Sequence, residues 1–93
     1  MSEDASVQLK KEIKAAMVEE LMLQQSPEEI GDDVVLFSPE GLGLDSVDAL
    51  QLVVAIEKRF GLKISDAEAA KGILRSVNTI AEAVLKHRSE EKR

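Results

Sequence analysis

Residues 45–61 constrain the fold most, because this helical segment is apolar on nearly all sides. Its apolar residues are Val47, Ala49, Leu50, Leu52, Val53, Val54, Ala55, Ile56 and Phe60. At about 100° per residue they cover far more than the single stripe of a surface helix. Either other elements bury more than one side of this helix, or part of it contacts a partner or an apolar cargo. We expect Leu50, Val53 and Phe60 to form the core row, and Val47 and Val54 to be exposed.

Residues typical of helix ends occur on both sides of this segment. Asp45 is a good N-cap, and Asp48 lies in the first turn, where negative charge is favoured. Lys58 and Arg59 lie in the last turn, and Gly61 suits the position just after it. The helix should therefore begin at Asp45 or Ser46 and end at Phe60 or Gly61.

Three further segments have helical patterns. From about Ser6 to Gln25, Leu9, Ile13, Met17 and Leu21 recur every four residues. Ser65 to Glu68 has the spacing of a capping box, which predicts a short helix ending near Lys71 or Gly72. Ser76 should cap a last helix with an apolar face of Val77, Ile80, Ala81, Val84 and Leu85. The predicted fold is all-α, a bundle of three main helices and one short helix, with one domain over residues 1–87 and a frayed polar tail at 88–93.

A long connection, Gln24 to Leu44, separates the first two helices. Ser26-Pro27 blocks helix continuation, and three glycines and a proline follow. Its apolar residues are Ile30, Val34, Val35, Leu36, Phe37, Leu42 and Leu44. A loop with so many apolar residues should pack against the core. Val34 to Phe37 has strand propensity, but the sequence offers no second strand to pair with it.

Composition excludes several classes of function. A chain of 93 residues is too short for a deep active site, and a net charge of −6 disfavours nucleic acid and anionic membranes. With no cysteine, disulfides and thiolate metal sites are excluded, and we expect no metal site. No signal peptide or membrane-spanning segment is apparent. We expect a monomeric cytoplasmic protein without catalytic activity of its own.

Ser46 is the best candidate for a functional residue. A serine in the first turn of a helix has an exposed hydroxyl beside unpaired backbone N–H groups, a position that tolerates phosphate. The hydroxyl could only cap the helix, or act as a nucleophile with His87, or mark a nucleotide-phosphate cradle with Gly41 and Gly43. The nucleophile lacks a Gly-x-Ser-x-Gly turn, and the cradle lacks a Gly-Lys-Ser/Thr sequence. The fourth alternative is that Ser46 accepts a covalent modification.

The segment Leu44-Asp45-Ser46-Val47-Asp48-Ala49-Leu50-Gln51-Leu52 is similar to the acyl carrier protein signature. The similarity extends to Phe60 and includes Ile64 to Ala69. It ends in the last predicted helix, which contains Val77, Ile80 and Val84. It implies a four-helix bundle whose Ser46 receives 4′-phosphopantetheine from coenzyme A, through a holo-acyl-carrier-protein synthase or another phosphopantetheinyl transferase. The thiol of this arm would then hold acyl thioesters, which suits a protein without cysteine.

The resemblance also implies partners and a cargo pocket. Acyl-transferring and chain-elongating synthase enzymes would dock on the second helix, with Asp45, Val47, Asp48, Val54 and Glu57 as recognition residues. The candidates for an acyl pocket are Leu50, Val53, Ile56, Phe60 and Ile64.

Three features differ from the common fatty-acid carriers. Gln51 replaces a usual glutamate, Lys58 and Arg59 replace acidic residues, and Gly72 to Leu74 appears inserted. Opposite charges on a docking face change partner choice more than fold. The approach from Phe37 to Leu44 also differs from the usual form, and it resembles that of stand-alone carriers dedicated to a special lipid or polyketide pathway. The resemblance therefore leaves both fatty acid synthesis and a specialised lipid or polyketide pathway open. Two alternatives stay open, an aminoacyl or peptidyl carrier and a helical interaction module without a prosthetic group.

Overall fold

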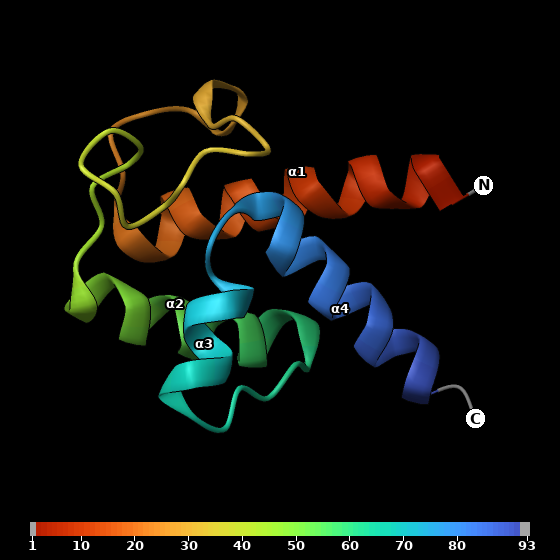
Figure 1. The fold of residues 1–93 in the computed structure, drawn as a ribbon. Helices are drawn as coiled ribbons and strands as arrows, with labels where there is room; N and C mark the ends of the chain where they lie inside the picture. Colours follow the sequence, from red (N-terminus) through yellow and green to blue (C-terminus); the bar gives the residue numbers. More distant parts are fainter. Residues whose placement is uncertain (1, 92–93) are drawn as a thin grey trace.

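The structure, a computed structural model, describes residues 2–91, and within that range the regular elements are all helical (Figure 1). The helices are α1 (Ser2–Leu21), the short 3₁₀ helix η1 (Pro27–Glu29), α2 (Ser46–Phe60), α3 (Ala67–Ile73) and α4 (Val77–Glu91). The predicted all-α bundle of three main helices and one short helix is confirmed. The segment Val34–Phe37 is not a strand.

The core lies where α1 packs against both α2 and α4. From α1 it receives Leu9, Ile13 and Met17, and from α4 it receives Val77, Ile80 and Val84. The buried row of α2 consists of Leu52, Ala55 and Ile56.

The predicted core row of α2 was therefore wrong. Leu50 is 67% exposed, and Val53 and Phe60 are only partly buried. Leu52, Ala55 and Ile56 follow the i, i+3, i+4 spacing of one helix face, and that face is the one turned inward. Because α2 is apolar nearly all round, its pattern alone did not indicate which face this would be.

Helix α1 begins and ends four residues earlier than expected. It stops at Leu21 because Met22 adopts a left-handed conformation with φ 53°. The Leu23 amide then donates to the Val18 carbonyl at 3.1 Å, which is the six-to-one bond of a Schellman motif. Glycine usually occupies this position, so a methionine there does not mark the end of a helix.

The connection between α1 and α2 is packed against the core, as predicted. Ile30, Leu36 and Leu44 are buried in it. The Leu36 amide donates to the Arg75 carbonyl at 3.0 Å, and the Asn78 amide donates to the Asp32 carbonyl at 2.9 Å. The loop is thus bonded to the junction between α3 and α4, as the path of the yellow segment in Figure 1 suggests.

Ion pairs add a second attachment, between the loop and α1. Lys14 Nζ lies 2.6 Å from Asp32 Oδ1, and Lys10 Nζ lies 3.9 Å from Asp32 Oδ2. The hydrogen bond from Lys14, with the charges of both lysines, lowers the pKa of Asp32 against a smaller opposing effect of burial.

The caps of the last two helices differ in how well they were predicted. The side chain of Asp66, not Ser65, caps α3 by accepting from the Ala69 amide at 2.7 Å. Ser76 caps α4 as predicted, through reciprocal bonds with Thr79 of 2.9 and 3.3 Å. Helix α4 continues to Glu91, so residues 88–91 of the expected tail are helical, and Lys92 and Arg93 lie outside the described residues.

Candidate functional site at the start of helix α2

Ser46 is the first residue of α2, and its side chain is exposed. The cap of the helix is Asp45, whose Oδ1 accepts from the Asp48 amide at 3.0 Å. Asp48 Oδ2 accepts from the Asp45 amide at 3.1 Å, which completes a capping box. Among the described residues no hydrogen bond involves the Ser46 hydroxyl. The Ser46 hydroxyl therefore takes no part in capping the helix.

The glycines before Ser46 shape a turn. The amides of Gly41 and Gly43 both donate to the Ser38 carbonyl at 2.9 Å, and Gly43 has φ +67°. A Cβ on Gly41 would overlap the carbonyl oxygen of Val35. Because both N–H groups already have a partner, the glycines do not form a cradle for a nucleotide phosphate.

A cavity of about 480 Å³ opens beside Ser46. Its lining is mostly apolar and comes from the loop, α2 and the α3 segment: Val35, Phe37, Ser46, Ala49, Ala70, Lys71, Leu74 and Arg75. His87 is not part of this lining, which leaves the proposed nucleophile without its base. A second cavity of about 330 Å³ is lined by Ala49, Leu50, Val53, Ile64, Ser65, Asp66 and Ala70. The two cavities share Ala49 and Ala70.

The structure brings together only part of the predicted acyl pocket. Leu50, Val53 and Ile64 line the second cavity, whereas Ile56 is fully buried in the core. Phe60 lies outside both linings, and its ring centre is 6.0 Å from the Arg88 guanidinium carbon. Sequence reasoning missed Val35 and Phe37, although the apolar loop residues were the signal that could have found them.

An apolar stripe runs along the outer face of α2. Val47, Leu50 and Val54 are 63%, 67% and 50% exposed. The exposure predicted for Val47 and Val54 is confirmed. The acidic recognition candidates Asp45 and Glu57 are exposed, and Asp48 is partly so.

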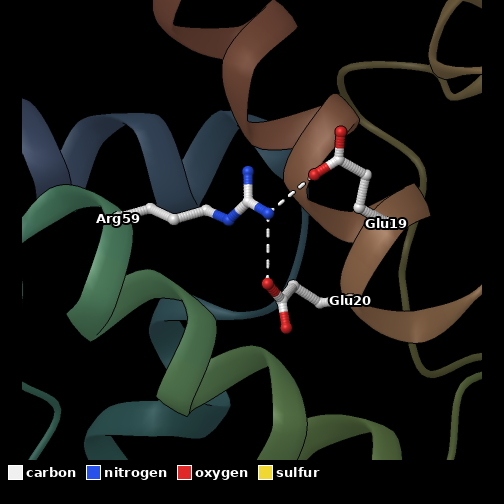
Figure 2. Close-up of polar contacts among 3 residues, drawn as sticks. All are labelled: Glu19, Glu20 and Arg59. Atoms are coloured by element: carbon white, nitrogen blue, oxygen red, sulfur yellow. Dashed lines mark hydrogen bonds and ion pairs between the residues drawn. The ribbon is translucent and has the colours of Figure 1, made fainter.

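Lys58 and Arg59 have different roles although they are neighbours in sequence. Figure 2 shows one guanidinium nitrogen of Arg59 between two carboxylates of α1, 2.7 Å from Glu19 and 3.1 Å from Glu20. These bonds raise the pKa of Arg59. Lys58 is exposed, and no ion pair joins it to another residue in the range 2–91. Of the two cations, Lys58 is the one available to a partner.

Comparison with known proteins now identifies the family. Residues 11–84, which include Ser46, match the family model described as "Phosphopantetheine attachment site". The chain belongs to the acyl carrier protein family. An acyl carrier protein of Campylobacter hominis is 35% identical over 78 residues, 83% of this chain and 94% of the relative. Another from Wolinella succinogenes is 40% identical over 60 residues (64% and 74%), and one from a Sulfurovum strain is 33% identical over 73 residues (78% and 85%).

The prosthetic group of this family is 4′-phosphopantetheine, and the site fits it. An exposed hydroxyl without a hydrogen bond lies at the rim of a mostly apolar cavity, on a helix end whose cap is made by another residue. No described helix is both long and apolar enough to cross a membrane.

Proposed function

We propose that Ser46 is the attachment point of 4′-phosphopantetheine and that the protein carries acyl groups. The exposed, unbonded Ser46 hydroxyl at the start of α2 is the observation that carries this proposal. When attached, the arm supplies a thiol that holds acyl groups as thioesters. The chain itself contributes a fixed helix end, an accessible oxygen and an adjacent apolar cavity.

The partners are a phosphopantetheinyl transferase and acyl-transferring and chain-elongating enzymes, in the cytoplasm. They dock on the outer face of α2, where the exposed stripe of Val47, Leu50 and Val54 supplies apolar contact. Asp45 and Asp48 favour basic groups on the partner near Ser46, and Lys58 favours an acidic group near the other end of the helix. This mixed charge supports a specialised lipid or polyketide pathway over general fatty acid synthesis. The protein has a carrier role and no catalysis of its own.

Loading in vitro tests the proposal. The apo protein is incubated with coenzyme A, magnesium and a promiscuous phosphopantetheinyl transferase, and its intact mass is measured. We expect the wild type and Ser65→Ala, a change at another exposed serine, to gain the mass of one phosphopantetheine, and Ser46→Ala to gain none. An unchanged wild-type mass, or equal gains in Ser46→Ala, would contradict the proposal.

A further inference from the structure

Two cations line the same cavity as Ser46. Lys71 lies in the last turn of α3, and Arg75 follows Leu74, the C-cap of that helix. Both side chains are exposed, and neither forms an ion pair within residues 2–91. The rest of the lining, apart from Ser46 itself, is apolar. The cavity therefore combines an apolar wall with two unused positive charges.

The backbone connects Arg75 to the approach of Ser46 through two hydrogen bonds. The Arg75 carbonyl accepts from the Leu36 amide, and the Leu36 carbonyl accepts from the Leu44 amide, each at 3.0 Å. Leu44 is buried and stands two residues before Ser46. The position of Arg75 relative to the start of α2 thus depends on buried loop contacts and not on the side chain alone.

At the start of α2, two carboxylates oppose the favourable effect of the helix dipole on an attached phosphate. Asp45 and Asp48 flank Ser46, and the whole protein has a net charge of −6. A phosphate placed beside carboxylates is destabilised by like-charge repulsion, whereas arginine and lysine bind phosphate through charge-assisted hydrogen bonds. Lys71 and Arg75 are the charged residues that share the cavity with Ser46.

We propose that Lys71 and Arg75 bind the phosphodiester that joins the arm to Ser46, and so hold the base of the arm at the mouth of the cavity. This inference rests on attachment at Ser46. The phosphodiester is the occupant that the geometry favours, because it begins at the Ser46 oxygen, whereas a charged group on the cargo lies at the far end of a long arm.

The test compares fully loaded proteins, each verified by intact mass. The test variant is Lys71→Gln/Arg75→Gln, and its matched control is Lys58→Gln/Lys63→Gln. The control removes the same charge from two exposed residues that do not line the cavity. Lys58 is twelve residues from Ser46 along α2, which is about 18 Å at the helical rise per residue.

The readout is the ³¹P chemical shift of the phosphodiester between about 0.02 and about 1 M NaCl, a range over which the Debye length falls to about 3 Å. In the wild type and the control, the shift should move as salt screens the ion pairs. In Lys71→Gln/Arg75→Gln, the shift should stay near the high-salt value throughout. Loading should also change the melting temperature, and this change should be more favourable in the wild type than in Lys71→Gln/Arg75→Gln.

The results separate this inference from the proposed function. A protein that cannot be loaded at Ser46 overturns both. Normal loading, with the same salt response in the wild type and in Lys71→Gln/Arg75→Gln, overturns only the role of these cations. An effect of the substitutions that appears only when the arm bears a carboxylate-containing acyl group also overturns it, because the cations then bind cargo.

Discussion

Two residues with positive φ end α1 and α2, and only one of them is glycine. Met22 follows α1 with φ 53°, and Gly61 follows α2 with φ 72°. The left-handed conformation costs an L-residue about 1–2 kcal/mol, whereas glycine adopts it freely. The Met22 side chain is 85% exposed, so its removal sacrifices little burial. Met22→Gly should therefore stabilise the protein.

The magnitude follows from two opposing effects. Relief of about 1–2 kcal/mol in the folded state is offset by about 0.5–1 kcal/mol, because glycine gives the unfolded chain more conformational freedom. The midpoints of these two ranges give a net gain of about 0.75 kcal/mol. For a domain of this size, that gain raises the melting temperature by about 3–6 °C.

Gly61→Ala provides the opposite experiment. A Cβ at Gly61 would have no heavy atom within 4 Å, so any loss comes from backbone conformation and not from a clash. We expect this variant to lose about as much free energy of unfolding as Met22→Gly gains.

Urea unfolding, followed by circular dichroism, measures both effects. The midpoints should move in opposite directions while the slope with denaturant stays constant, which shows that stability alone has changed. Met22→Ala is the control, since it removes the long side chain but keeps an L-residue, and it should show no gain. If Met22→Gly unfolds at the same urea concentration as Met22→Ala or earlier, the conformational argument is refuted.

Three further predictions concern packing and charge. Leu52→Ala should lower the free energy of unfolding, measured in urea, by about 2–5 kcal/mol because Leu52 is 1% exposed. Leu50→Ala should change it by no more than about 0.5 kcal/mol. Equal losses in the two variants would contradict the orientation of α2. Since the pKa of Asp32 is lowered in the folded state, its contribution is present above the unfolded pKa of about 3.9 and is lost as pH falls through the folded value. Asp32→Asn should thus lower the melting temperature at pH 7, with a cost of at most about 1 kcal/mol for a pair whose carboxylate is accessible to solvent. The difference from the wild type should vanish in strong acid. Arg59→Gln should speed amide hydrogen exchange in the last turn of α1, and Lys58→Gln should not; the same exchange rates in both variants would argue against the contact in Figure 2.

Local signals predicted the helices well where a specific side chain marks the boundary. Asp45 and Gly61 bound α2 as expected, and Ser76 caps α4. The prediction was wrong where the chain departs from the usual residue, as at Met22, or where two caps compete, as Ser65 and Asp66 do. Asp66 is chosen because its carboxylate accepts directly from the Ala69 amide.

The site was predictable only at its centre. Ser46 could be named as the candidate because a hydroxyl at a helix start and the Asp-Ser motif are both local features. The cavity beside it is assembled from the loop, α2 and the α3 segment, which are far apart in sequence. An apolar residue in a loop signals burial but not which cavity it lines, so Phe37 and Leu74 could not be assigned to the site in advance.

The distribution of charge along α2 changes what its unusual residues mean. In sequence, Lys58 and Arg59 together suggest a helix end whose docking charge is reversed. In the structure, Arg59 is bonded to Glu19 and Glu20, so its charge stabilises the contact between α1 and α2. Lys58 is then the cation left for partners, and it stands about 18 Å along the helix from Ser46. A transferase that contacts mainly Asp45, Ser46 and Asp48 would not contact Lys58. An enzyme that covers the whole helix would contact it. Loading should therefore tolerate Lys58→Glu, while discrimination among acyl-processing enzymes should respond to it.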